Sequence, residues 1–139
     1  MRYYLDTNIL LFILQNEHDE IHRDIKAIIK DDSNTFFVSS IVIAELLFLF
    51  RIKKVKFRPQ YKNESDILAQ ITKLGIKTVN FSQENLSTYF SLQIDDSHKD
   101  INDHLIISQA ISDKIPLISS DNKFPFYEKQ KLKFVFNKR

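Results

Sequence analysis

Short β-prone apolar runs alternate with longer stretches of helical periodicity along this chain. That alternation is typical of an α/β domain with a mostly parallel sheet. The pattern predicts five strands, at Arg2–Leu5, Thr35–Val38, Lys77–Asn80, Ile115–Ile118 and, as an edge strand, Lys133–Phe136. It predicts six helices, at Thr7–Gln15, Asp19–Lys30, Ile41–Ile52, Tyr61–Leu74, Ile101–Asp113 and a segment capped by Ser82.

Cap residues refine several of these helix ends. Ser39 or Ser40 can cap the helix that follows them, and Gly75 is a natural stop for the helix before it. The segment that begins at Ser82 has Asn85 where a capping box would have an acid. The four isoleucines of the second predicted helix are expected on one face; they are Ile21, Ile25, Ile28 and Ile29.

The bulk composition favours one domain spanning residues 1–139 with an ordinary core, since 43% of residues are hydrophobic. One glycine and three prolines argue against long linkers, and the lack of cysteine excludes disulfides and thiolate metal sites. The N-terminus has no signal-peptide pattern, and the longest apolar run, Ile41–Phe50, is too short to span a bilayer. We expect a cytoplasmic protein without a membrane partner.

Four acids stand at positions where a parallel α/β sheet gathers its ligands. Asp6 and Asp121 each follow an apolar strand, and parallel strands end at one edge of the sheet. Asp103 lies in the first turn of a predicted helix, and Glu45 lies within an apolar helix. Hard divalent cations such as Mg²⁺ bind oxygen ligands, so convergent carboxylates indicate a metal site that needs no histidine.

Each acid also has a purely structural explanation. Asp6 suits a helix N-cap, Asp103 is favoured by the helix dipole, and Asp121 suits a turn. Glu45 has nine apolar neighbours from Ile41 to Phe50, which predicts a buried helix in which an unpaired carboxylate costs several kcal/mol. The alternative for Glu45 is a narrow polar stripe that leads the side chain to water.

The segments around these acids resemble the motifs of PIN-domain nucleases, in particular the VapC toxins of type II toxin–antitoxin pairs. Leu5–Leu10 resembles the opening motif, and Ser39 followed by Glu45 resembles the second. Asp103–Ala110 and Leu117–Phe124 resemble the third and fourth. The resemblance runs from Tyr4 to about Tyr127, nearly the whole chain.

This resemblance implies a three-layer α/β/α sandwich around a parallel sheet of about five strands. It also implies a Mg²⁺ site, with Mn²⁺ as an alternative, RNA cleavage, a homodimer and neutralisation by a small antitoxin protein. The metal ligands it implies are Asp6, Glu45, Asp103 and Asp121, supported by Asn8, Ser119 and Asp100.

Two positions depart from the family pattern. His104 stands where many relatives have arginine, which changes a phosphate contact or has no effect. Ser119 stands where threonine is common and keeps the hydroxyl group that positions a ligand.

A run of basic residues without an acid offers a surface for RNA phosphates. It comprises Arg51, Lys53, Lys54, Lys56, Arg58 and Lys62. Phe57 and Tyr61 are interleaved with it, where their rings could stack on bases. A solvated loop is the bland interpretation of the same run.

These features predict a metal-dependent endoribonuclease in which metal-bound water attacks a phosphodiester. The alternative is a catalytically silent module that uses the same fold to hold RNA or a partner protein. A phosphatase of the haloacid dehalogenase type would need an acid where Asn8 stands, and a receiver domain would need a lysine after a later strand that we do not find.

Overall fold

The computed structural model describes residues 1–139 and is organised around a sheet of five parallel strands in the order β3-β2-β1-β4-β5. The strands are β1 (Arg2–Leu5), β2 (Thr35–Ser39), β3 (Lys77–Val79), β4 (Leu117–Ser119) and β5 (Phe134–Phe136). All five predicted strands are present, and β5 is an edge strand as expected.

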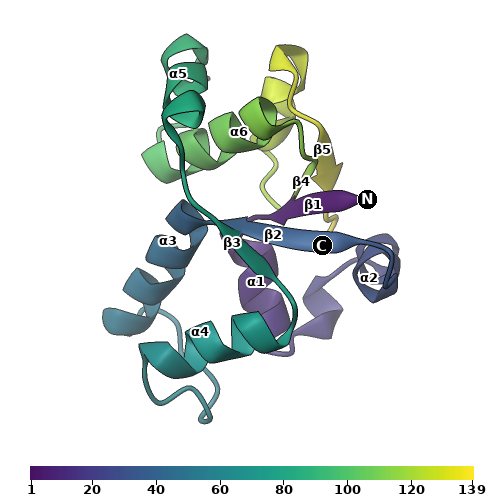
Figure 1. The fold of residues 1–139 in the computed structure, drawn as a ribbon, viewed down its shortest axis with the longest axis vertical. Coiled ribbons are helices and arrows are strands. Elements are labelled where there is room, and N and C mark those ends of the chain that lie inside the picture. Colours follow the sequence, from purple (N-terminus) through teal and green to yellow (C-terminus); the bar gives the residue numbers. More distant parts are fainter.

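Six α-helices and two 3-10 helices connect these strands. The α-helices are α1 (Thr7–Leu14), α2 (Arg23–Lys30), α3 (Ser40–Arg51), α4 (Glu64–Lys73), α5 (Gln83–Ser91) and α6 (Ile101–Asp113). The 3-10 helices are η1 (His18–Glu20) and η2 (Phe124–Gln130). Helices α5 and α6 lie on one side of the sheet and α1, α3 and α4 on the other (Figure 1). The predicted α/β/α sandwich is therefore confirmed. None of the helices has the length and apolar character that crossing a membrane requires.

The core forms where β1 lies between its two neighbours. Tyr4 pairs with Phe37 of β2 and with Leu117 of β4, so β1 is covered on both edges. Tyr4, Leu5 and Leu117 are almost fully buried, as expected for parallel strands with helices on both faces.

The predicted helix over Asp19–Lys30 is wrong at its start. Ile21 is extended, with φ −108° and ψ 121°, and separates η1 from α2. His22 accepts a hydrogen bond at Nδ1 from the backbone N–H of Asp24, so it caps a new helix instead of continuing the old one. Ile21 still reaches the core and is 4% exposed.

The start of one other helix differs from prediction because of capping, whereas α5 begins directly after its predicted cap, Ser82. Helix α4 begins at Glu64 instead of Tyr61, since Asn63 and Asp66 form a reciprocal capping box. At α5, the Asn85 side chain accepts the bond from the Ser82 N–H that an acid would ordinarily accept, so the capping box is complete without an acid. Gly75 ends α4 as predicted, at φ +77°.

The strand order creates a crevice at one edge of the sheet. From β1 the chain goes outward to β2 and β3, and then returns to the other side of β1 to form β4 and β5. The carboxyl ends of β1 and β4 therefore flank the point where the strand order reverses, which is where open α/β sheets bind ligands.

Candidate metal centre

A cleft of about 280 Å³ lies at this reversal point and contains all four predicted acids. It is lined by Asp6, Thr7, Asn8, Leu11, Glu45, Leu49, Asp100, Asp103 and Asp121. The acids come from the ends of β1 and β4, from α3 and from the start of α6. Segments far apart in the sequence thus place five carboxylates on one small cavity.

Asp6 is the most buried of these acids and is 4% exposed. Its Oδ1 accepts a 2.8 Å bond from the Thr7 N–H, so the helix-cap interpretation of Asp6 holds as well. Its Oδ2 accepts a 2.6 Å bond from Ser119 Oγ. Burial, with smaller contributions from the nearby Asp103 and Glu45, raises the pKa of Asp6 to about 7, although these hydrogen bonds oppose the shift.

Ser119 and Asn8 connect Asp6 to the loop after β4. Ser119 Oγ accepts a 3.0 Å bond from the Asp121 N–H while it donates to Asp6. Asn8 Oδ1 accepts a bond from the Ser120 N–H, and its Nδ2 lies 3.4 Å from Asp6 Oδ2. The Ser119 and Asn8 side chains thereby hold the Asp6 carboxylate, just after β1, against the turn that presents Asp121.

Asp103 is partly buried in the first turn of α6. Its pKa is raised to about 7, mainly by burial and to a smaller extent by the negative charges of Asp100, Asp121 and Glu45. Asp100 caps α6 by accepting a bond from the Asn102 N–H and remains exposed. The raised pKa values of Asp6 and Asp103 reflect burial first and the charges of neighbouring carboxylates second.

The prediction that Glu45 is an expensive buried carboxylate is wrong. Helix α3 buries Val42 and Leu46, whereas Phe48 is 56% exposed on its open side. The helix covers the sheet with one face only, so its apolar sequence does not make it a core helix. Glu45 is half-buried at the cleft and accepts a 3.2 Å bond from Asn102 Nδ2.

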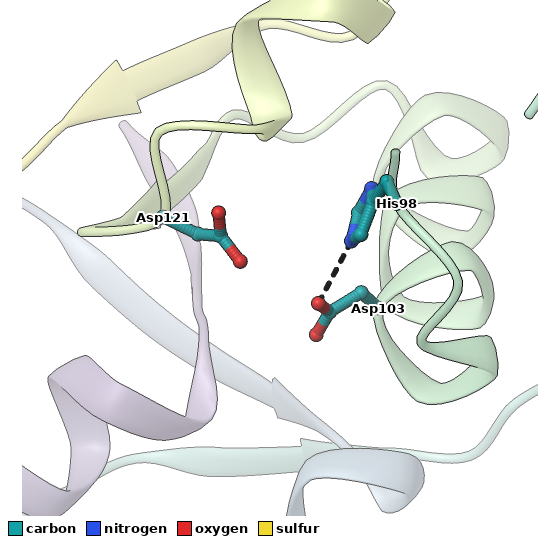
Figure 2. A group of neighbouring side chains, drawn as sticks. All are labelled: His98, Asp103 and Asp121. Carbon is teal, nitrogen blue, oxygen red and sulfur yellow. Dashed lines mark hydrogen bonds and ion pairs between the residues drawn. The ribbon is translucent and has the colours of Figure 1, made fainter. Parts of the chain in front are cut away.

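Asp121 points into the same space from the turn after β4 (Figure 2). Its Oδ1 accepts a bond from the Lys123 N–H. The Lys123 ammonium reaches Ser97 O at 2.9 Å and partly offsets the charge on Asp103.

His98 joins the cluster, and sequence reasoning missed it. Its Nε2 lies 2.9 Å from Asp103 Oδ2. One His98 nitrogen and oxygens of Asp103 and Asp121 lie close enough together to bind a single metal ion (Figure 2). His98 is 2% exposed although it stands in a polar loop. The available signal was its position five residues before Asp103, but burial of a loop histidine is not visible in a sequence.

His104 does not contact the cleft. Its Nε2 lies 2.8 Å from the carbonyl oxygen of His98, and its ring is 5% exposed. Burial lowers the pKa of His104, which favours the neutral ring. The side chain supports the loop that holds His98 and is not part of the cleft lining, while its effect on phosphate contact stays a prediction.

The chemistry of the cleft fits a divalent cation. Carboxylate oxygens are the ligands that Mg²⁺ and Mn²⁺ prefer, and their mutual repulsion would be relieved by a bound cation. Thr7 also lines the cleft, and its buried Oγ atom has no hydrogen-bond partner in the chain. Asp6, Glu45, Asp103 and Asp121 line the cleft and could hold such an ion. Of these acids, Asp103 and Asp121 have ligand atoms within 4.8 Å of one another, together with His98.

The basic run lies at a distance from the cleft. Gln15, just beyond α1, bonds to the backbone of Lys56 and Arg58, so the loop lies near the end of α1 remote from Asp6, roughly 12 Å along the helix axis. Arg51 is paired with Glu64, whereas Lys53, Lys54, Lys56 and Arg58 are exposed.

The two rings of this segment are not free to stack on bases as predicted. Tyr61 is buried and donates its hydroxyl to Leu14 O. Phe57 is half-buried and packs edge-on against Phe50 and Tyr61.

Comparisons with known proteins agree with this architecture. Residues 3–130 match the PIN domain family. The chain is 31% identical over 127 residues to Ribonuclease VapC2 of Rickettsia felis, covering 88% of this chain and 89% of that protein.

Solved structures give the same result. The chain is similar to a crystal structure of VapBC2 from Rickettsia felis bound to a DNA fragment from its promoter, with a TM-score of 0.67, 25% identity and 99% of both chains covered. VapBC-1 from nontypeable Haemophilus influenzae has the same fold, with a TM-score of 0.61 and 20% identity over 98% of both chains. This chain therefore belongs to the PIN-domain family and is VapC-like.

Proposed function

We propose that the protein is a Mg²⁺-dependent endoribonuclease and the toxin of a toxin–antitoxin pair. The observation that supports this most strongly is the single cleft at the β1–β4 switch point, where five carboxylates converge and two have raised pKa values. The relative that shares 31% identity is named a ribonuclease. We extend the proposed nuclease domain over residues 1–139.

In this proposal, Asp6, Asp103 and Asp121 hold the ion, and Glu45 completes the site directly or through water. When bound, a divalent cation supplies an acidified water and stabilises negative charge on the phosphate. Mn²⁺ would satisfy the same oxygen ligands.

The chain's own groups orient these ligands. Ser119 donates to Asp6 Oδ2 and receives the Asp121 N–H, so one hydroxyl sets the spacing of two ligands. Asn102 holds Glu45 across the gap between α6 and α3. Such supporting contacts typically change metal affinity or activity by roughly 10–100-fold when they are removed.

RNA would approach over the basic loop that follows α3. The candidate contacts are Arg51, Lys53, Lys54, Lys56 and Arg58. These residues lie about one helix length from the cleft, a distance that several nucleotides of an extended strand could span. The salt bridge between Arg51 and Glu64 makes Arg51 the least available of the five.

A small antitoxin protein and a second copy of the chain are the proposed protein partners. The structural relatives include toxin–antitoxin complexes such as VapBC2. The exposed apolar residues of α3, including Phe48, provide surface for such contacts.

Cleavage of a structured RNA panel in Mg²⁺ or in EDTA tests the enzymatic function. The wild-type protein should cut in Mg²⁺ and stop in EDTA, and activity should return when excess Mn²⁺ is added. Asp6→Asn and Asp103→Asn should cut below detection because each removes one ligand charge. Asp19→Asn, at an exposed acid of η1, is the matched control and should retain full activity.

RNA that binds but is not cut under any metal condition would favour the silent binding module. Equal cleavage by wild type and Asp6→Asn would reject the assigned site.

A further inference from the structure

We propose that His98 is a positioning residue that holds the Asp103 carboxylate through a hydrogen-bond relay beginning at the backbone N–H of Asp95. This inference rests on the proposed metal site and adds a group that the four acidic motifs do not contain. The relay passes from Asp95 through Tyr127 and His98 to Asp103.

The direction of the relay follows from its first bond. The backbone N–H of Asp95 can only donate, so Tyr127 Oη accepts that 3.3 Å bond. The hydroxyl proton of Tyr127 then has one partner, His98 Nδ1 at 3.0 Å. A neutral imidazole that accepts at Nδ1 carries its proton on Nε2.

The Nε2–H group of His98 is aimed at the candidate ligand. Nε2 lies 2.9 Å from Asp103 Oδ2, a good distance for a bond to a carboxylate. Asp103 Oδ1 has no hydrogen-bond partner in the chain, so this oxygen is left for the cleft. His98 thereby divides the two oxygens of Asp103 into one that is held and one that is available.

Aromatic packing fixes the imidazole ring in this orientation. His98 is 2% exposed, and its ring centroid lies 4.7 Å from that of His104 and 5.6 Å from that of Tyr127. Phe124 covers it at 5.8 Å. His104 also anchors the backbone of His98 through the bond from its ring to the His98 carbonyl oxygen. Because these contacts keep the His98 imidazole in one orientation, it can hold the Asp103 carboxylate in a fixed position.

The alternative role for His98 is direct metal coordination, because its nitrogen lies near oxygens of both Asp103 and Asp121. Coordination would require an unprotonated Nε2 and a proton on Nδ1. The Tyr127 hydroxyl would then accept two bonds and leave its own proton without an acceptor. The relay satisfies every donor and therefore accounts better for the observed contacts.

The first test is the tautomer of His98 in the metal-free protein, measured by ¹⁵N NMR at pH 8.5. We expect protonated Nε2 and unprotonated Nδ1, and Tyr127→Phe should weaken that preference. A proton on Nδ1 in the wild type would overturn the relay. This readout needs neither metal nor activity.

The second test is the dissociation constant for Mn²⁺, measured from the free-ion signal in electron paramagnetic resonance. His98→Leu should weaken binding by roughly 10–100-fold, as expected when a ligand loses its supporting partner. His98→Gln places an amide donor near the position of Nε2 and should stay within a few-fold of wild type. His18→Leu, at an exposed histidine of η1, is the control.

Thermal unfolding in EDTA separates a fold defect from a positioning role. A purely structural His98 would lower the unfolding temperature in His98→Leu without changing the Mn²⁺ affinity of the folded protein, and that result would reject the proposal. Equal loss in His98→Gln and His98→Leu would indicate direct coordination and would also reject it. Wild-type protein that binds no Mn²⁺ would refute the proposed metal site and the role of His98 together.

Discussion

At the level of single residues, the cleft keeps two of its acids buried close to other carboxylates. Asp6 and Asp103 have pKa values raised to about 7, in both cases mainly by burial and then by neighbouring carboxylates. Such groups lower the free energy of unfolding as long as no cation is bound to the site. The cost should therefore depend on pH and on metal.

The pH dependence has a definite sign. The ordinary pKa of aspartate is 3.8, so between about pH 4 and 7 the folded chain retains protons on Asp6 and Asp103 that the unfolded chain has released. The free energy of unfolding in EDTA should therefore fall as pH rises through this window and level off above it. Denaturant unfolding from pH 5 to 8.5 measures this fall.

The variant Asp6→Asn isolates the contribution of that residue. The decline with pH should be shallower in Asp6→Asn than in wild type, and saturating Mg²⁺ should flatten the wild-type curve. If wild type and Asp6→Asn declined in parallel in EDTA, the Asp6 carboxyl would not have the raised pKa.

The site could be predicted from the sequence only where a motif fixes the position of a residue. Asp6, Asp103 and Asp121 were found because each follows a strand or stands early in a helix at that edge of the sheet. His98 and Asn102 were missed because their contacts depend on how a loop folds over α6. Glu45 was found for a wrong reason, since its apolar helix buries Val42 and Leu46 but leaves Phe48 exposed and Glu45 half-buried.

At the level of elements, the residue that follows the C-terminal strand is linked to the turn that presents Asp121. Asn137 follows β5 and is fully buried. Its side chain donates to Glu20 O and Ser120 Oγ and accepts from the His22 N–H. This one residue joins the C-terminus to η1 and α2 and to the turn that presents Asp121.

Replacement of Asn137 tests this connection. Asn137→Ala removes three hydrogen bonds and leaves buried polar groups without partners, so we expect a loss of about 1–3 kcal/mol in the free energy of unfolding. Lys138→Ala, at the exposed neighbour, should cost almost nothing. Chemical denaturation of both variants gives the comparison, and equal stability of the two would show that the connection is dispensable.

The elements themselves were largely predictable, whereas their ends were not. Hydrophobic periodicity located every strand and α-helix. The starts of α2 and α4 depend on side-chain caps at His22 and Asn63, and these compete with a helical pattern that continues upstream. The 3-10 helix η2 was not predicted, since periodicity over so few residues is weak.

At the scale of the whole molecule, the net charge of +2 hides a separation of charge. Carboxylates fill the cleft, and exposed lysines gather on the loop after α3. An RNA strand would be held by the loop while its phosphate meets the acidic site. Binding should therefore depend on salt through the loop, and cleavage on metal through the cleft.

Neutralising Lys53, Lys54 and Lys56 together to glutamine should weaken RNA binding and flatten its salt dependence. For three lost phosphate contacts, the slope of log affinity against log salt should decrease by about 2. Fluorescence anisotropy with Asp6→Asn protein, which should not cut the probe, measures this slope. The triple substitution of Lys30, Lys73 and Lys77, exposed elsewhere, is the charge-matched control. An equal effect of both triple variants would mean that the loop has no special role.

The proposed function requires that the acids of this cleft form one divalent-cation site. Anomalous diffraction from a crystal soaked in Mn²⁺, recorded at the manganese absorption edge, tests it most directly. We expect an anomalous peak within coordination distance of Asp6, Asp103 and Asp121, and no peak there in Asp6→Asn crystals grown and soaked in the same way. A manganese peak found only outside the cleft would contradict this site. So would a cleft without a peak in crystals whose protein, once dissolved, cuts RNA in Mn²⁺.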